Sequence, residues 1–167
     1  VQVFVAMTPE ETVYFANPGP DGKFNSDFFF HWADYNIVHV NRWQDIARSL
    51  LSIPKAHELI GFYTVADGAD GVLKVMRPYQ IAAAEKISDV VSKYKWEILP
   101  DKVNQLGGYV WHTTGSGKTM TSFKSAQLIA LSKTADKVVF LMDRIELGTQ
   151  SLEEYRNFAA ENESVQA

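Results

Sequence analysis

The chain has 167 residues, of which 46% are hydrophobic and 13% aromatic, so it holds enough apolar material for a packed core and is not an intrinsically disordered chain. Sixteen Lys and Arg residues against twenty Asp and Glu residues give a net charge of −4, so any contact with DNA must come from a local basic patch. Cysteine is absent, which excludes disulfides, thiolate zinc sites and cysteine nucleophiles. With no signal peptide and no apolar run as long as a membrane span, we expect a cytoplasmic protein without a membrane partner.

Two β-prone runs open the chain, residues 2–7 and 12–16, and the polar stretch Thr8–Glu11 between them predicts a hairpin turn. The chain begins without Met and already inside the first run, so we expect a piece of a larger protein. Residues 17–22 are dense in Pro, Gly, Asn and Asp, which predicts a surface loop.

An aromatic run follows at Phe28–Trp32. Such a run could be a platform on which nucleic-acid bases stack. A buried strand or packing anchor is the favoured interpretation, because aromatic side chains are mostly buried. His31 and His39 have no second cluster at ligand spacing, so we interpret both as structural or exposed rather than metal-binding.

Helical spacing of apolar residues predicts a helix from Asn41, as its cap, to about Leu51. A short second helix is predicted over 55–61, and a brief strand over 62–65. The small and acidic residues of 67–71 are interpreted as a turn or linker and as the boundary between domains.

Residues 72–80 lead into a long helix that is predicted to end near Trp96 and to pack on a sheet. Pro78 suits the first helical position, where its missing N–H costs nothing. Gln80 then lies at the helix start, and an amide there can pair with the donor and acceptor edge of adenine. A surface glutamine with no such role is the alternative.

A glycine-rich stretch, Thr114–Gly117, follows the apolar run 108–111 and precedes Lys118 and Thr119. Glycine lets the backbone turn several N–H groups toward one anion. Lys118 can reach the β- and γ-phosphates of a nucleotide, and the hydroxyl of Thr119 can coordinate Mg²⁺. The predicted order of strand, loop and helix fits a phosphate-binding loop for ATP.

One position departs from the general motif G-x-x-x-x-G-K-[ST], because His112 occupies the place of its first glycine. A glycine-rich turn with an incidental lysine is the alternative interpretation. The helix after the loop is predicted to run from Lys118 to about Lys133, so that its N-terminal dipole faces the phosphates.

The apolar run 137–142 predicts a further buried strand, and Asp143 is expected to cap a helix over 145–158. Strand, loop, helix, strand and helix form a βαβ pattern. This pattern predicts a parallel sheet with right-handed crossovers and the nucleotide at the carboxyl ends of its strands.

Three stretches, Met76–Gln80, Gly107–Thr119 and 138–150, resemble in order and spacing three motifs of the R (HsdR) subunit of type I restriction-modification enzymes. In that family they are the adenine-recognition glutamine motif, helicase motif I and motif Ia of a superfamily-two, RecA-like motor. Residues 1–32 are similar to the closing strands of the family's PD-(D/E)xK nuclease domain. Helicases of this kind do not keep the first loop glycine, which accounts for His112.

The resemblance implies an α/β fold: a partial first lobe with a RecA-like P-loop parallel sheet over 72–167, preceded by a small α+β segment from the end of the nuclease domain over 1–40 and a helical linker over 41–71. It implies an ATP-dependent double-stranded DNA translocase and endonuclease, with methylation (M) and specificity (S) subunits as partners.

Carried over residue by residue, the resemblance implies that Gln80 reads adenine with help from Arg77 or Tyr79. The loop residues Thr114, Gly115, Ser116 and Gly117 and the side chain of Lys118 would hold the phosphates of ATP, and Thr119 would bind Mg²⁺. Arg144 and Gln150 would lie where DNA crosses the motor, although helix capping and surface solvation explain them equally well.

No Asp-Glu pair follows Thr119, and no nuclease acids are visible, so no catalytic residue is assigned and the chain alone is not expected to be a complete enzyme. The alternatives are another superfamily-two ATPase, of the type III restriction or chromatin-remodelling kind, and a non-catalytic scaffold between domains. A small-molecule P-loop kinase is a further alternative, but it predicts no role for Gln80.

Overall fold

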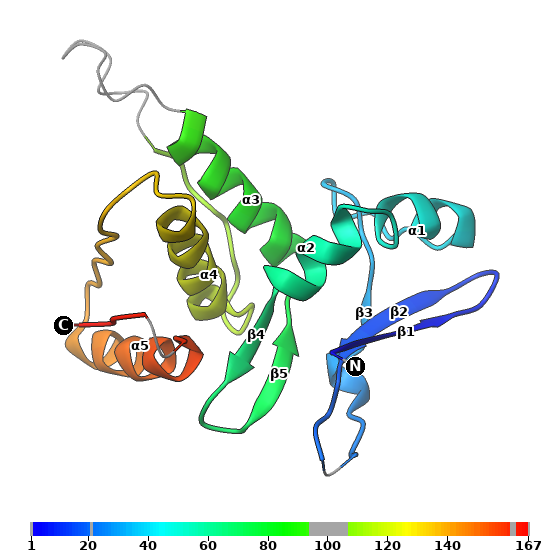
Figure 1. Ribbon diagram of the computed structural model, residues 1–167, viewed down its shortest axis with the longest axis horizontal. Helices are drawn as coiled ribbons and strands as arrows, with labels where there is room; N and C mark the ends of the chain where they lie inside the picture. Colours follow the sequence, from blue (N-terminus) through cyan, green and yellow to red (C-terminus); the bar gives the residue numbers. More distant parts are fainter. Residues whose placement is uncertain (1, 21, 94–106, 161–162, 167) are drawn as a thin grey trace.

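The computed structural model describes residues 2–20, 22–93, 107–160 and 163–166. Within them the chain forms two small antiparallel sheets, five α-helices and one 3-10 helix, a mixed α/β arrangement (Figure 1). The strands are β1 (Val3–Met7), β2 (Thr12–Ala16), β3 (Phe30–His31), β4 (Thr64–Asp67) and β5 (Val72–Val75). The helices are η1 (Ser26–Phe28), α1 (Trp43–Ser49), α2 (Lys55–Gly61), α3 (Pro78–Lys93), α4 (Lys118–Leu131) and α5 (Ile145–Phe158).

The first sheet has the order β1-β2-β3, and its β1-β2 hairpin confirms the predicted pairing, with Met7 opposite Thr12. The turn is stabilised by Thr8, whose hydroxyl oxygen accepts the Glu11 amide at 3.0 Å and whose own amide donates to the Glu11 carbonyl at 2.7 Å. Short local bonds of this kind explain why a polar stretch reverses the chain here.

Tyr14 of β2 is fully buried and joins the first sheet to the rest of the molecule. Its ring makes edge contacts with Phe30 and Trp32, and its hydroxyl donates to the Met76 carbonyl at 2.8 Å. Burial raises the pKa of this hydroxyl well above its usual value, so it stays a donor. The hydrophobic core contains buried residues from the first sheet and from the elements as far as α3. They are Tyr14, Trp32, Ile46, Leu50, Leu59, Tyr63, Val75, Met76, Ile81 and Ala84.

The stretch interpreted as a turn or linker, 67–71, lies in the β4-β5 hairpin, where Asp67 ends β4 and pairs with Val72 and residues 68–71 form the turn. Gly68 donates its amide to the Asn157 carbonyl of α5 at 2.8 Å, which ties this turn to the far end of the chain. The division of the chain into residues 1–40, 41–71 and 72–167 stays a prediction.

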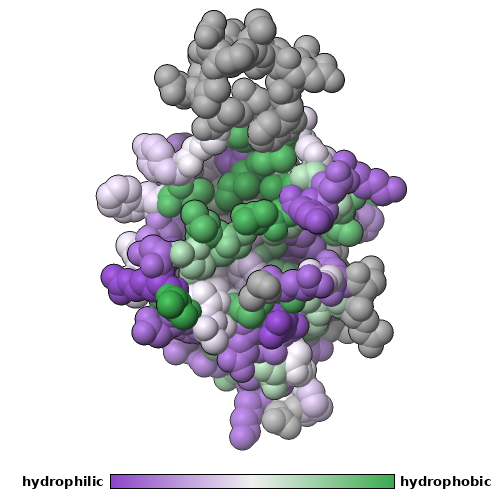
Figure 2. Space-filling view, turned by 90° about the vertical axis from the view of Figure 1, so that its left-hand side faces the viewer, coloured by the Kyte–Doolittle hydropathy of each residue, from purple (hydrophilic) through white to green (hydrophobic). Residues whose placement is uncertain are grey.

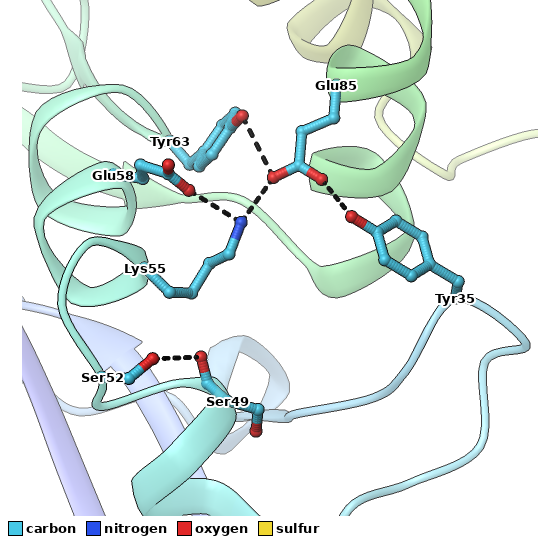
Figure 3. Close-up of polar contacts among 7 residues, drawn as sticks. All are labelled: Tyr35, Ser49, Ser52, Lys55, Glu58, Tyr63 and Glu85. Carbon is cyan, nitrogen blue, oxygen red and sulfur yellow. Dashed lines mark hydrogen bonds and ion pairs between the residues drawn. The ribbon is translucent and has the colours of Figure 1, made fainter.

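A polar cluster holds α3 against the elements before it (Figure 3). Glu85 of α3 accepts hydrogen bonds from Lys55 of α2 at 2.6 Å, from Tyr63 at 3.3 Å and from Tyr35 at 2.7 Å. Glu58 also pairs with Lys55 at 2.7 Å. Burial lowers the pKa of Lys55, but the bonds from its ammonium to the two carboxylates outweigh burial and raise it overall. The cluster therefore fixes α3, and with it the residues at the start of that helix.

The helices after α2 follow the prediction closely, since α5 has the expected bounds and α4 ends two residues before Lys133. The predicted end of α3 near Trp96 lies outside the described residues. Two predicted caps were wrong: Arg42 rather than Asn41 precedes α1, and Arg144 rather than Asp143 precedes α5. Both arginines have extended dihedrals and neither makes a side-chain cap bond, so these helices begin without one.

The predicted parallel sheet does not form among the described residues, because 108–111 and 137–142 are not strands. Both runs are largely exposed, with Trp111 at 87% and Leu141 at 92%, and a strand needs a neighbouring strand to pair its backbone. In consequence α3 packs along α4 rather than on a sheet (Figure 1). Figure 2 shows hydrophobic residues gathered on the face that carries α4 and α5.

Candidate nucleotide-binding site

The glycine-rich loop bends sharply before α4. Gly115 and Gly117 both have φ of +76°, in the left-handed region that side chains with a Cβ rarely adopt. Gly117 is the residue immediately before α4, and Lys118 is the first residue of that helix. The unpaired amides of the helix start therefore lie beside the loop, an arrangement that suits an anion.

Lys118 is exposed, and its ammonium donates to the Thr113 carbonyl within the loop at 2.9 Å. The Ser116 hydroxyl donates to the same carbonyl at 2.7 Å. Thr114 is exposed at the turn, while Thr119 is half-buried in the first helical turn. The Thr113 carbonyl thus accepts hydrogen bonds from both the cation and a hydroxyl of the loop.

Gln80 is only 4% exposed and reaches the loop from α3. Its amide oxygen accepts the Arg77 backbone N–H at 2.9 Å, and its amide nitrogen donates to the Gly117 carbonyl at 3.2 Å. A primary amide has two N–H groups and two lone pairs, so one of each remains for a ligand. The alternative of a solvated surface glutamine does not describe this buried side chain.

Tyr79 makes a second link between α3 and the loop. Its hydroxyl donates to the Ser116 carbonyl at 3.0 Å and accepts from Arg77 at 3.2 Å. The ring also meets His112 edge-on, with centroids 5.4 Å apart. Partial burial, followed by the nearby charge of Lys118, lowers the pKa of His112, which favours its neutral form beside the loop.

A cavity of about 440 Å³ opens beside the loop and extends toward the N-terminal segment. Residues of the loop and of the α3 start line one part of it: Arg77, Gln80, Gly115, Ser116 and Gly117. Phenylalanines of the N-terminal segment line another part: Phe15, Phe24, Phe28, Phe29 and Phe30. The sequence favours a packing anchor for Phe28–Trp32 and gives no signal that Phe24 lines a cavity.

The residues of the aromatic run Phe28–Trp32 differ in environment: the last is buried in the core, and the first is exposed at the cavity. Trp32 is buried in the core at 8% exposure, which confirms an anchor at that end. Phe28 is 59% exposed, so burial does not account for it. Arg77 lies over the Phe30 ring, with its guanidinium carbon 4.9 Å from the ring centroid. His31 and His39 stack at 5.1 Å, and the described residues hold no cluster of metal-ligating side chains.

The two residues predicted to meet DNA lie apart from this cavity, and neither lines it. Arg144 precedes α5 with an exposed side chain, 4.0 Å from the Asp143 carboxylate. Gln150 is exposed on α5 and donates to Glu154 at 3.1 Å. Among the described residues no helix has the length and hydropathy that a membrane crossing requires.

Residues 79–167 match the SWI2/SNF2 ATPase family. The chain is 35% identical over 161 residues to a type I restriction enzyme endonuclease subunit of Staphylococcus aureus (strain COL), and 31% identical over 159 residues to one of Staphylococcus saprophyticus. Each alignment covers 95% of this chain but 16% of the relative. An endonuclease subunit of Escherichia coli is 33% identical over 87 residues, which are 52% of this chain and 28% of that subunit.

Proposed function

Because the chain belongs to the SWI2/SNF2 ATPase family and is similar over nearly its whole length to endonuclease subunits of type I restriction enzymes, we propose that it is a segment of such a subunit and that its glycine-rich loop binds ATP. The observation that carries the proposal is the docking of Gln80 on the Gly117 carbonyl, directly beside Lys118. This contact unites the predicted adenine-reading residue and the predicted phosphate-binding loop in one site.

The residues present fit a magnesium nucleotide. A methyl group on Gly115 would meet nothing within 4 Å, so its backbone is open to a close ligand. The amides of Thr114–Gly117 would cradle the phosphates, Lys118 would hold the β- and γ-phosphates, and Thr119 would offer its hydroxyl to Mg²⁺. When bound, the metal would neutralise phosphate charge during transfer.

Gln80 would read adenine with the N–H and the lone pair that its protein contacts leave free. Arg77 and Tyr79, which are hydrogen-bonded to each other, would support Gln80 from the start of α3. The Tyr79 bond to Ser116 supports this arrangement, because it fixes the start of α3 relative to the loop. Adenine offers a donor beside an acceptor on one edge, which one amide can match; guanine presents two acceptors there.

In the whole subunit, ATP binding and hydrolysis would drive translocation along double-stranded DNA, and a nuclease domain, of which residues 1–40 would be the end, would cleave it. Methylation and specificity subunits would complete the complex. Arg144, immediately before α5, and Gln150, within that helix, would meet the DNA backbone through their exposed side chains.

Calorimetric titration of the intact polypeptide with Mg·ATP and Mg·GTP, beside a Gln80→Ala variant, tests the proposal. We expect ATP to bind more tightly than GTP and the preference to vanish in the variant. Lys118→Ala is the companion variant, and it should weaken both nucleotides alike because the lysine meets phosphate only. Equal binding of ATP and GTP by the wild type would refute the role of Gln80, whereas unchanged binding by Lys118→Ala would refute the loop assignment.

A further inference from the structure

The cavity beside the phosphate loop joins two unlike surfaces. One is the polar backbone of Gly115–Gly117 with Gln80, and the other is a wall of phenylalanines from residues 15–30. That wall lies outside the part of the chain that matches the SWI2/SNF2 ATPase family, which begins at residue 79. The N-terminal segment therefore reaches a site that the ATPase family alone does not describe.

Most of the wall is held firmly by its own ring contacts. Phe29 stacks on Phe15 with centroids 4.2 Å apart and an interplanar angle of 22°. Phe24 meets Phe15 edge-on at 5.7 Å and Phe4 at 6.2 Å, yet stays 59% exposed. These contacts fix the shape of the wall without covering its cavity side.

Phe28 differs from its neighbours. It ends η1, it is 59% exposed, and among the described residues no other ring contacts it. Asn25 fixes the start of this turn by accepting the Asp27 amide at 3.0 Å, so the ring is presented from an ordered segment. An exposed aromatic ring that lines a cavity is suited to stacking on a flat ligand.

We propose that Phe28, with Phe24 beside it, stacks on the base of the nucleotide whose phosphates the loop holds. The inference rests on the proposed function and adds that the N-terminal segment supplies part of the ATP site. A purine carries its polar atoms on the ring edge and an apolar π surface on its face. In the proposed complex, Gln80 would pair with the polar edge of the purine, and the phenylalanines would contact its apolar face.

Stacking and edge pairing have different effects: stacking sets the affinity for any nucleotide, and edge pairing sets the selectivity between ATP and GTP. Every base has a π face, so stacking strengthens binding of ATP and GTP equally. An amide matched to one edge discriminates between them. A defect at Phe28 must therefore leave the ATP-to-GTP ratio unchanged, whereas a defect at Gln80 must alter it.

The test is calorimetric titration of the intact polypeptide with Mg·ATP, Mg·GTP and inorganic tripolyphosphate, which has phosphates but no base. Phe28→Ala should weaken ATP and GTP by about tenfold each and leave tripolyphosphate unchanged. Phe28→Tyr keeps an aromatic face and should stay within about twofold of the wild type. Phe62→Ala is the matched control, because Phe62 is also exposed, at 47%, but does not line the cavity.

Equal affinity of the wild type and Phe28→Ala for ATP would overturn the inference, and so would a loss that includes tripolyphosphate, since that would report a disturbed loop. In either case the wild type still binds ATP and tripolyphosphate, and the proposed function stands. If the wild type binds neither ligand, the proposed function fails and the inference fails with it.

Discussion

The Gln80 amide nitrogen lies 3.2 Å from the Gly117 carbonyl, and a Cβ added to Gly117 would lie 2.5 Å from the same nitrogen. Real Cβ atoms essentially never lie so close to another atom, so a side chain at position 117 would require the flexible end of Gln80 to move away from the Gly117 carbonyl. Glycine at position 117 is therefore favoured for two reasons, the left-handed backbone and the hydrogen-bonded position of Gln80.

Gly117→Ala is expected to weaken ATP binding more than Gly115→Ala. Both glycines have φ of +76°, so alanine carries a comparable backbone cost of about 1–2 kcal/mol at either position. Only position 117 adds the collision with Gln80, because nothing lies within 4 Å of a Cβ at position 115. Titration with ATP measures the difference. Inorganic tripolyphosphate has no base for Gln80 to read, so it should bind the double variant Gly117→Ala/Gln80→Ala more tightly than it binds Gly117→Ala. Equal losses in the two single variants would contradict the collision.

Tyr14→Phe is expected to destabilise the fold by about 1–2 kcal/mol without removing any apolar contact. The Tyr14 hydroxyl donates to the Met76 carbonyl in a fully buried setting, and its loss leaves that carbonyl without this donor. Urea unfolding gives the change in free energy of unfolding. Tyr35→Phe is the control, since its bond to Glu85 is exposed and should contribute less than about 0.5 kcal/mol.

Because of Asp67, the β4-β5 hairpin is expected to lose stability as the pH becomes acidic. Burial raises the pKa of this carboxyl, but hydrogen bonds from Lys74 and from the Ala69 amide outweigh burial and hold it below its usual value. A lowered pKa stabilises the fold above the unfolded value of about 3.9, and that stabilisation is lost as pH falls through the folded value.

Asp67→Asn should therefore lower stability by about 1–2 kcal/mol at pH 7 and flatten the loss of stability below about pH 4. Thermal unfolding across pH 2–7 measures both effects. Asp70→Asn is the matched control, because its carboxylate lies 3.3 Å from the same ammonium but is 62% exposed. If Asp67→Asn loses stability at acid pH in the same way as the wild type, then other carboxylates cause that loss.

Arg144→Ala is expected to weaken DNA binding by the intact polypeptide and to reduce the slope of log affinity against log salt by about 1. Among the described residues the exposed guanidinium has one ion partner, the Asp143 carboxylate at 4.0 Å, which leaves it available to phosphate. Gln150→Ala should leave the salt slope unchanged, because an amide releases no counterion. An unaltered slope in Arg144→Ala would place Arg144 outside the DNA contact.

The helices were predictable because their signals are local. Pro78 begins α3 as expected, and the bounds of α5 agree with the prediction. The strands predicted at 108–111 and 137–142 do not form, because a strand exists only with a partner to complete its hydrogen bonds, and composition does not reveal whether one is near.

The same distinction applies to the site. The loop from Thr114 to Thr119 is one contiguous motif, so its residues could be selected from the sequence, although their roles stay predictions. The Phe28 wall could not be placed beside it, because their proximity results from the packing of β2, β5 and the start of α3. No periodicity in the sequence encodes such a contact.

The exposed run 137–142 has a consequence for handling the polypeptide in solution. Val139 and Leu141 are 85% and 92% exposed, and an unpaired apolar segment of this composition is a template for cross-β self-association. Lys137 begins the run and Asp143 follows it, and these charges oppose the approach of a second copy. Because its apolar side chains are exposed, any aggregation should nucleate in this run, and Val139→Lys should raise the concentration at which turbidity appears.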